Sequence, residues 1–190
     1  PLASVPPNPV PAVTLSVPGT VFIGENFTFS ATFDNADPTP PPNGDDAGYG
    51  PYIDIYLPVT GADGAGAATD DGITALLSAT YLGAPLNVVQ RTFNASGVVN
   101  HPYAVTATGS PVQITGGTPG DRLYSIELPF GSFTPEQPPV TVNITATLSN
   151  LADVGTPLTI RANGGFRYGA TPLNDWCCGD PSIIGPPGAN

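Results

Sequence analysis

The stretch VTVNITATLS, residues 140–149, alternates apolar and polar side chains over its whole length. Successive side chains of a β-strand point to opposite faces, so its valines, isoleucine, alanine and leucine would all point to one side. Threonine, asparagine and serine would then share the other side. A helix would scatter the same apolar residues around its axis. This pattern therefore predicts a strand with one buried face and one wet face.

The same period of two recurs along much of the chain. NFTFSATF (26–33) and YIDIYL (52–57) show it clearly. Weaker alternation marks residues 13–17, 86–93, 111–115, 122–128 and 157–162, and residues 165–169 would add a last edge strand. DDGITALLSATYLG (70–83) fits either a helix or a strand. Half-polar strands argue against a parallel sheet, so the chain is predicted to be all-β, an antiparallel sandwich. Its 25 prolines and 23 glycines would supply the turns.

A chain of 190 residues suits one large domain with a real core. We expect residues 1–12 to be a proline-rich arm or linker, residues 13–170 the sandwich domain, and residues 171–190 a C-terminal loop or tail. The tail holds two adjacent cysteines, Cys177 and Cys178. A disulfide between neighbours closes only a strained ring, yet an oxidised pair would fit an extracellular setting. Free thiols and bridges to another chain stay open as alternatives.

The charge balance excludes several partners. Four arginines and no lysine stand against 15 acidic residues, which gives a net charge of -11. Phosphate binding needs a cationic surface, so nucleic acid is excluded as a partner and an anionic membrane is disfavoured. No apolar run approaches the length of a membrane span, so we expect no membrane insertion. The acidic balance suits solubility in a salty or calcium-bearing medium, and we expect an extracellular or cell-surface location.

Aspartates gather in two long segments, residues 34–51 and 58–72, that flank one predicted strand. Flexible loops rich in glycine and aspartate can supply the six to eight oxygen ligands of calcium, although neither segment matches the EF-hand loop. Calcium is therefore the leading metal hypothesis. The alternative is that aspartate is simply a residue that turns favour. The candidate ligands are Asp34, Asp37, Asp45, Asp46, Asp54, Asp63, Asp70 and Asp71.

Tyrosines suggest a second kind of site. Tyr49, Tyr52 and Tyr56 lie near the first acidic segment, and alternation places Tyr52 and Tyr56 on the polar face of their strand. Exposed rings of this kind can stack on sugars, so a calcium-assisted module that binds glycans or a protein is the alternative function. Tyrosines on strands also commonly cover the sheet.

A hydrolase is the third class to be weighed. His101, the single histidine, lies in NHPY, which we interpret as a turn. A Ser–His–Asp arrangement could be drawn from Ser132, His101 and an aspartate, but the G-x-S-x-G motif is absent. A hydrolase would need His101 within hydrogen-bond reach of a nucleophile. We expect no enzyme.

Glycosylation sequons occur at Asn26, Asn94 and Asn143. Three is close to the number that chance would place in this composition. Asn143 is expected on the outward face of its strand, where a glycan would need that face to be free.

The segment VPGTVFIGENFTFSATFDN resembles the opening of immunoglobulin-like repeat domains found in large bacterial surface and secreted proteins. Val21, Gly24, Phe27, Phe29 and the FDN of residues 33–35 carry the match. GYGPYIDIYLP, LPFGSFTPEQPP and LTIRANGGFRYG look like later strands and loops of such a domain. The resemblance implies an immunoglobulin-like β-sandwich and a non-catalytic, structural or adhesive extracellular module. It also implies an array of like domains. Separately, the proline-rich arm could add a strand to the open sheet edge of a like domain or subunit and so build a filament, with a plain linker as the alternative.

Overall fold

The structure is a computed structural model that describes residues 9–37, 46–61, 71–105 and 109–168. Within these ranges the chain is all-β, and every strand pair is antiparallel. The same ranges contain no helix, and therefore none that is long and apolar enough to cross a membrane.

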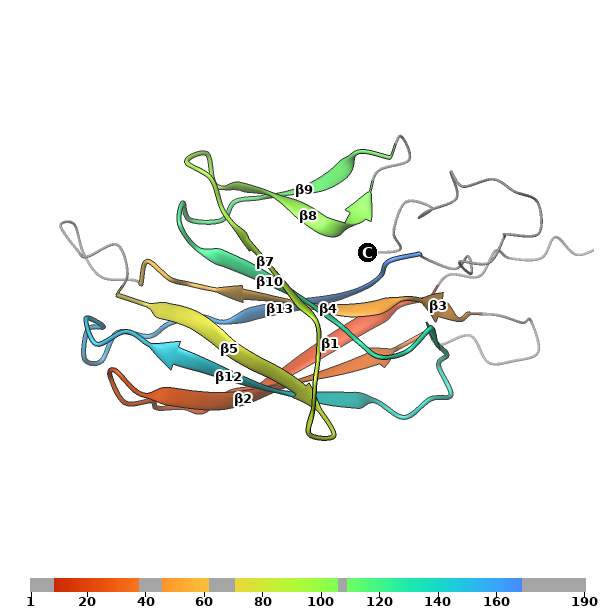
Figure 1. The fold of residues 1–190 in the computed structure, drawn as a ribbon, viewed down its shortest axis with the longest axis horizontal. Helices are drawn as coiled ribbons and strands as arrows, with labels where there is room; N and C mark the ends of the chain where they lie inside the picture. The colour runs from red at the N-terminus through yellow and green to blue at the C-terminus, as the bar shows by residue number, and fades with distance from the viewer. Residues whose placement is uncertain (1–8, 38–45, 62–70, 106–108, 169–190) are drawn as a thin grey trace, which may run out of the picture.

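Two larger sheets face each other (Figure 1). The first sheet has the order β1-β2-β12-β5-β6, with β1 at Pro11–Ser16, β2 at Asn26–Asn35, β12 at Val140–Leu148, β5 at Ile73–Tyr81 and β6 at Ala84–Pro85. The second sheet has the order β13-β4-β10-β7, with β13 at Arg161–Phe166, β4 at Pro51–Leu57, β10 at Arg122–Glu127 and β7 at Val88–Thr92. Two smaller pairs join β3 (Gly48–Tyr49) to β11 (Ser132–Phe133), and β8 (Val98–Val105) to β9 (Pro111–Thr115).

The core lies between the two larger sheets. The apolar positions of β12 are buried, as are Ile53, Ile55 and Leu57 of β4. Phe33 of the first sheet meets the ring of Phe166 from the second sheet edge to face, with centroids 5.5 Å apart. The alternating apolar side chains of the two sheets therefore pack into one core, as the sequence predicts.

Most of the predicted strands are confirmed, with shifts at their ends. The ambiguous stretch 70–83 contains strand β5, and β13 replaces the two strands predicted over 157–162 and 165–169. β1 begins inside the predicted arm, and Val10 is already tied to the first sheet, since its N–H donates to Asn35 Oδ1 at 2.9 Å. Residues 1–8 of the arm and the tail from 169 to 190 lie outside the described residues.

A third layer covers the outer face of the second sheet. The hairpin β8–β9 lies over β4 and β10, and Phe93, Val99 and Leu123 form a small second core beneath it. The sequence pattern did not predict β8, because its buried positions include a histidine and Pro102 interrupts the run. The prediction that the polar face of β4 is open is wrong for this reason: Tyr52 and Asp54 are 2% and 6% exposed.

The two ends of the sandwich contain different parts of the chain. The chain enters and leaves the described fold at one end, where Val10 bonds to Asn35 and the N–H of Tyr168 donates to the carbonyl of Tyr49. We call this end the chain-end pole; it lies on the right of Figure 1. The opposite end, which we call the pocket pole, holds the β1–β2 and β12–β13 loops.

Candidate functional site

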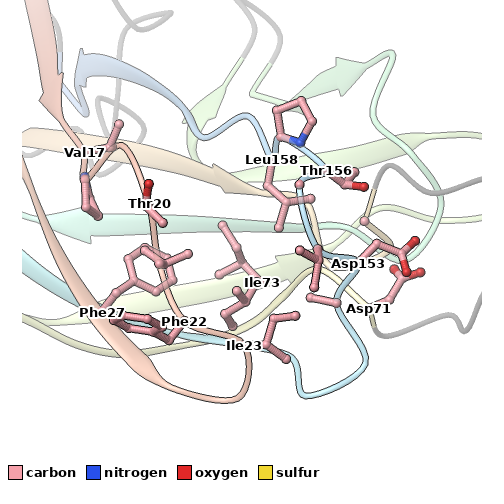
Figure 2. Close-up of a pocket in the computed structure, with 18 of the residues that line it drawn as sticks. Val17, Thr20, Phe22, Ile23, Phe27, Asp71, Ile73, Asp153, Thr156 and Leu158 are labelled. Carbon is pink, nitrogen blue, oxygen red and sulfur yellow. The ribbon is translucent and has the colours of Figure 1, made fainter.

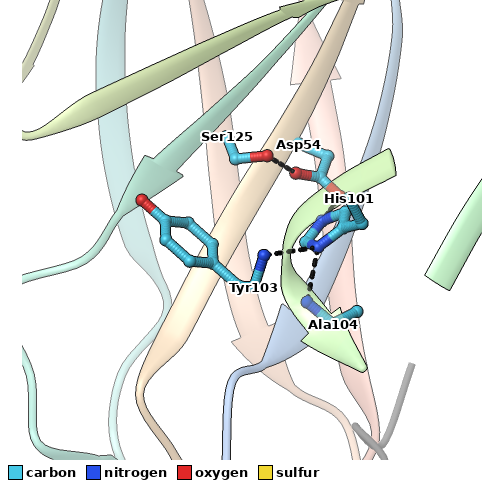
Figure 3. Close-up of polar contacts among 5 residues, drawn as sticks. All are labelled: Asp54, His101, Tyr103, Ala104 and Ser125. Atoms are coloured by element: carbon cyan, nitrogen blue, oxygen red, sulfur yellow. Dashed lines mark hydrogen bonds and ion pairs between the residues drawn. The ribbon is translucent and has the colours of Figure 1, made fainter. Parts of the chain in front are cut away.

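A polar cluster is buried between the hairpin and the second sheet (Figure 3). Asp54 of β4 and Ser125 of β10 are direct cross-strand neighbours, and Ser125 Oγ donates to Asp54 Oδ1 at 2.5 Å. His101 reaches down from β8, and its Nε2 lies 2.8 Å from Asp54 Oδ2. The side chains of His101 and Asp54 are only 2% and 8% exposed. The cluster therefore joins two layers of the fold without contact with bulk water.

Hydrogen bonds fix the protonation of the imidazole. Nδ1 of His101 accepts the backbone N–H groups of Tyr103 and Ala104, at 3.0 and 2.7 Å. A nitrogen that accepts two N–H groups carries no proton of its own, so the proton sits on Nε2 and is donated to Asp54. Both ring nitrogens are thus occupied, and the carboxylate is shared between the imidazole and the serine hydroxyl.

This arrangement differs from a nucleophilic relay. In a Ser–His–Asp triad the imidazole bonds to the serine, so that it can take the hydroxyl proton. Here Ser125 bonds to Asp54 instead, and His101 has no nitrogen left for a nucleophile. The structure does not bring Ser132 to His101: Ser132 is an exposed residue of β11, paired with Tyr49. Chemically, the cluster is suited to hold the hairpin in place. His101 also lies within strand β8, which corrects the predicted turn.

The three candidate tyrosines do not form one exposed platform. Tyr52 is buried against the rings of His101 and Tyr103, with centroids 5.0 and 5.7 Å apart. Tyr56 is partly buried and packs edge to face against Phe93. Tyr49 lies in the short strand β3 near the chain-end pole and is partly exposed. The hairpin layer therefore removes Tyr52 as a ligand-stacking surface.

A second buried aspartate, which the sequence analysis missed, braces a loop. Asp121 Oδ1 accepts the N–H groups of Val59 and Thr60, at 2.8 and 3.0 Å, and the Thr60 hydroxyl at 2.9 Å. Its Oδ2 accepts the hydroxyl of Tyr56. Burial and this bond to Asp121 raise the pKa of Tyr56. The local sequence PGDR reads only as a turn, so no pattern in the chain could have singled this residue out.

The calcium candidates separate into different parts of the fold. Asp34, Asp37 and Asp46 lie toward the chain-end pole, where the Asp46 carbonyl accepts the side chain of Asn35. Asp54 belongs to the buried cluster, and Asp71 lies at the pocket pole. The described part of the chain holds no group of three or more histidine, cysteine, aspartate or glutamate side chains placed to bind a metal. Asp45, Asp63 and Asp70 lie outside it, so calcium binding stays a prediction.

A pocket of about 680 Å³ opens at the pocket pole (Figure 2). The loop of residues 17–23 forms one wall, and residues 152–160 form another. Phe27, Ile73 and Leu148, from the ends of three strands of the first sheet, also line it. The sequence does not reveal this site, because its apolar residues belong to two loops that only the topology brings together. The one signal was the run VFI at 21–23, apolar yet outside an alternating strand.

One charged group inside this pocket stands out. Asp71 is 3% exposed, and neither of its carboxylate oxygens has a hydrogen-bond partner in the structure as described. Asp153, which is exposed, lines the same pocket. In Figure 2 both aspartates lie at the end of the pocket away from Phe22 and Phe27. The pocket therefore combines apolar walls with negative charge.

The three sequon asparagines are all exposed. Asn26 Oδ1 accepts the Thr147 hydroxyl at 2.8 Å, and Asn94 Oδ1 accepts the N–H groups of Ser96 and Val98. These bonds leave the side-chain nitrogen, where a glycan would be attached, outside the contacts. Asn143 and Asn26 lie on the same outer face of the first sheet, on the neighbouring strands β12 and β2. Cys177 and Cys178 lie outside the described residues.

Comparison with known proteins finds little. No family model and no curated protein matches the chain. A solved structure described as "AvmM Catalyzes Macrocyclization in Alchivemycin A Biosynthesis" is similar over 94% of this chain and 79% of its own, with 16% identity and a TM-score of 0.35. A similarity at this level carries no argument about function. The class that the structure itself defines is an all-β protein of antiparallel sheets.

Proposed function

We propose that this protein is a non-catalytic, extracellular structural module that associates with like copies of itself. The observation that carries the proposal is the open edge of the second sheet. β7 pairs with β10 on one side only, is mostly exposed, and has no strand on its other side among the described residues. An unpaired edge can accept an added strand through backbone hydrogen bonds.

The alternation of backbone groups along β7 identifies which N–H and C=O groups are free to bond to an added strand. Asn87 and Phe93 make their backbone bonds to the β10 side. Backbone groups alternate along a strand, so Val88, Gln90 and Thr92 direct theirs outward. The Gln90 carbonyl accepts Arg91 Nη1 at 3.0 Å, which leaves the Gln90 N–H for a partner. An incoming strand from the N-terminal arm of a second copy would bond along this row.

Several features support an extracellular setting. The chain has a net charge of -11 with no lysine, and all three sequon asparagines are exposed on the surface. An immunoglobulin-like sandwich, as the resemblance implies, would suit such a module. The strand order is particular, however: the last two strands, β12 and β13, lie in different sheets, whereas the last two strands of an immunoglobulin domain are neighbours in one sheet.

Sedimentation velocity on the full chain tests the proposal. We expect association that rises with concentration and is lost when residues 1–8 are deleted. Residues 9–12 are kept because β1 begins at Pro11 and Val10 is hydrogen-bonded to Asn35 of the first sheet. Gln90→Pro removes one outward N–H without disturbing the bonds to β10, so it should also abolish association. Gln90→Ala keeps that N–H and should associate normally. A full chain that stays monomeric, or association that survives both changes, would refute strand addition at this edge.

A further inference from the structure

The pocket at the opposite pole supports a second kind of interaction, independent of the β7 edge. We propose that it binds a basic side chain, lysine or arginine, carried on an apolar segment of a partner protein. The buried carboxylate of Asp71 would receive the charge, and the apolar walls would hold the aliphatic stem.

Asp71 is buried, and its carboxylate has no hydrogen-bond partner among the described residues. A buried carboxylate without a hydrogen bond costs free energy, and natural proteins pair such groups. Among the described residues neither Asp71 oxygen is paired, and the carboxylate packs against Gly61, another lining residue of the pocket. Each oxygen has less than 1 Å² of exposed surface, so a donor that enters the pocket could pair with this carboxylate once the groups that cover it move aside. The unpaired group is thus a reason for affinity.

The pocket contains no positively charged side chain of its own among the described residues. The chain has no lysine, and none of its four arginines lines the pocket. Arg122 and Arg167 are engaged elsewhere, Arg122 on the Thr74 carbonyl and Arg167 on Glu127 at 3.2 Å. The fold described here therefore offers Asp71 no cation of its own. Asp153 at the same pocket adds to the negative potential, so a ligand from outside should be cationic.

The shape and polarity of the pocket match a basic side chain. Lysine and arginine carry a charged head on an apolar stem, which matches apolar walls that end in a carboxylate. The apolar surface also continues beyond the pocket: Phe22 and Val154 on its rim are 79% and 90% exposed, and Leu151 nearby is 57% exposed. Apolar side chains gathered at one place on a surface mark interaction sites. A rim of this extent favours a polypeptide over a small amine.

Isothermal titration of the full chain with short peptides tests this inference. The probe is an acetylated, amidated peptide with the sequence Leu-Val-Lys-Val-Leu, beside matched peptides with arginine or norleucine in place of lysine. Norleucine keeps the stem and removes the charge. We expect a basic peptide to bind at least about tenfold more tightly than the norleucine peptide, since a charge-assisted bond is worth that much or more. Equal affinities would overturn the proposal.

Variants of the protein test which carboxylate of the pocket binds the basic side chain. Asp71→Asn should weaken binding of the basic peptide at least about tenfold while leaving the norleucine peptide unchanged. The same change should raise the melting temperature of the free protein, because it removes an unpaired buried charge; a lower melting temperature would show a structural role and overturn the proposal. Asp153→Asn, at an exposed position, is the matched control and should have a smaller effect.

Two further probes separate other ligands. Butylamine supplies the charge and stem without the peptide, so binding as tight as that of the lysine peptide would replace the protein partner with a small amine. Calcium chloride tests the metal: calcium binding that Asp71→Asn abolishes, with no peptide binding, would assign Asp71 to a cation site. Both results would overturn the proposal. All these titrations can be run on Gln90→Pro, so that self-association does not contribute.

Discussion

Nε2 of His101 lies 2.8 Å from Oδ2 of Asp54, a contact that joins residues 47 positions apart in the chain and two layers of the fold. Asp54 also holds the hydroxyl of Ser125, and His101 also holds two backbone N–H groups of its own strand. The pair is therefore the centre of a small network that fixes the hairpin β8–β9 on the second sheet.

The first prediction concerns the contribution of this pair to the free energy of unfolding. Asp54→Asn and His101→Gln should each lower the free energy of unfolding by about 1–3 kcal/mol, because each leaves a buried polar partner poorly satisfied. The double variant should lose less than the sum, with a coupling of about 1–3 kcal/mol. Urea denaturation followed by circular dichroism measures all four proteins. Effects that add to within about 0.5 kcal/mol would mean that the contact does not couple the layers.

The second prediction concerns Gly48, which has no room for a side chain. A Cβ at this position would overlap the ring of Phe166, which is fully buried. Gly48→Ala should lower the free energy of unfolding by about 1–3 kcal/mol, the usual cost of overpacking a core. Adding Phe166→Leu should recover part of that loss. The control is Gly131→Ala, where nothing lies within 4 Å of the new methyl group; it should be nearly neutral, and equal effects at both sites would contradict the packing argument.

The third prediction is a loss of stability in alkali. Burial, and then the negative charge of Glu127, raises the pKa of Tyr103 from 10.0 to about 12. Below pH 10 the phenol keeps its proton in both states, so it does not favour unfolding. Between pH 10 and about 12 the unfolded chain gives up this proton first, so stability should fall as the pH rises.

Tyr103→Phe provides the control for this pH effect. The free energy of unfolding, measured at about pH 9 and about pH 11, should drop less in the variant than in the parent chain. Equal drops would assign the alkaline loss to other groups.

The fourth prediction concerns calcium. If Asp46 contributes to a calcium site near the chain-end pole, added calcium should raise the melting temperature by several degrees and excess EDTA should reverse the gain. Asp46→Asn should remove the effect, whereas Asp153→Asn at the other pole should leave it unchanged. A melting temperature that does not respond to EDTA would end the calcium hypothesis for this domain.

The sequence predicted the strands wherever one face is buried and the other is wet. Residues 140–149 and 26–33 alternate without interruption, and both are central strands of the first sheet. It failed where a third layer covers the polar face, because side chains such as Asp54 and His101 look solvent-exposed in a pattern and are buried in the fold. Alternation reports one sheet at a time and cannot show what packs above it.

The pocket lay beyond sequence reasoning for another reason. Its walls come from loops that are separated by more than a hundred residues and meet only because β2 and β12 are neighbours. Asp71 was singled out as one of several acidic candidates, yet nothing in the local sequence distinguished it from the aspartates around it. Its isolation from any donor is a property of the packed fold.

The chain-end pole decides how the domain would respond to pulling. The start of β1 and the end of β13 lie at the same end of the fold, on the right of Figure 1. A force applied between them would peel these strands away from that end, breaking their ladder bonds in succession and not all together. The domain would therefore unfold at low force. In a longer assembly it would project sideways from its neighbours, with the pocket pole facing outward.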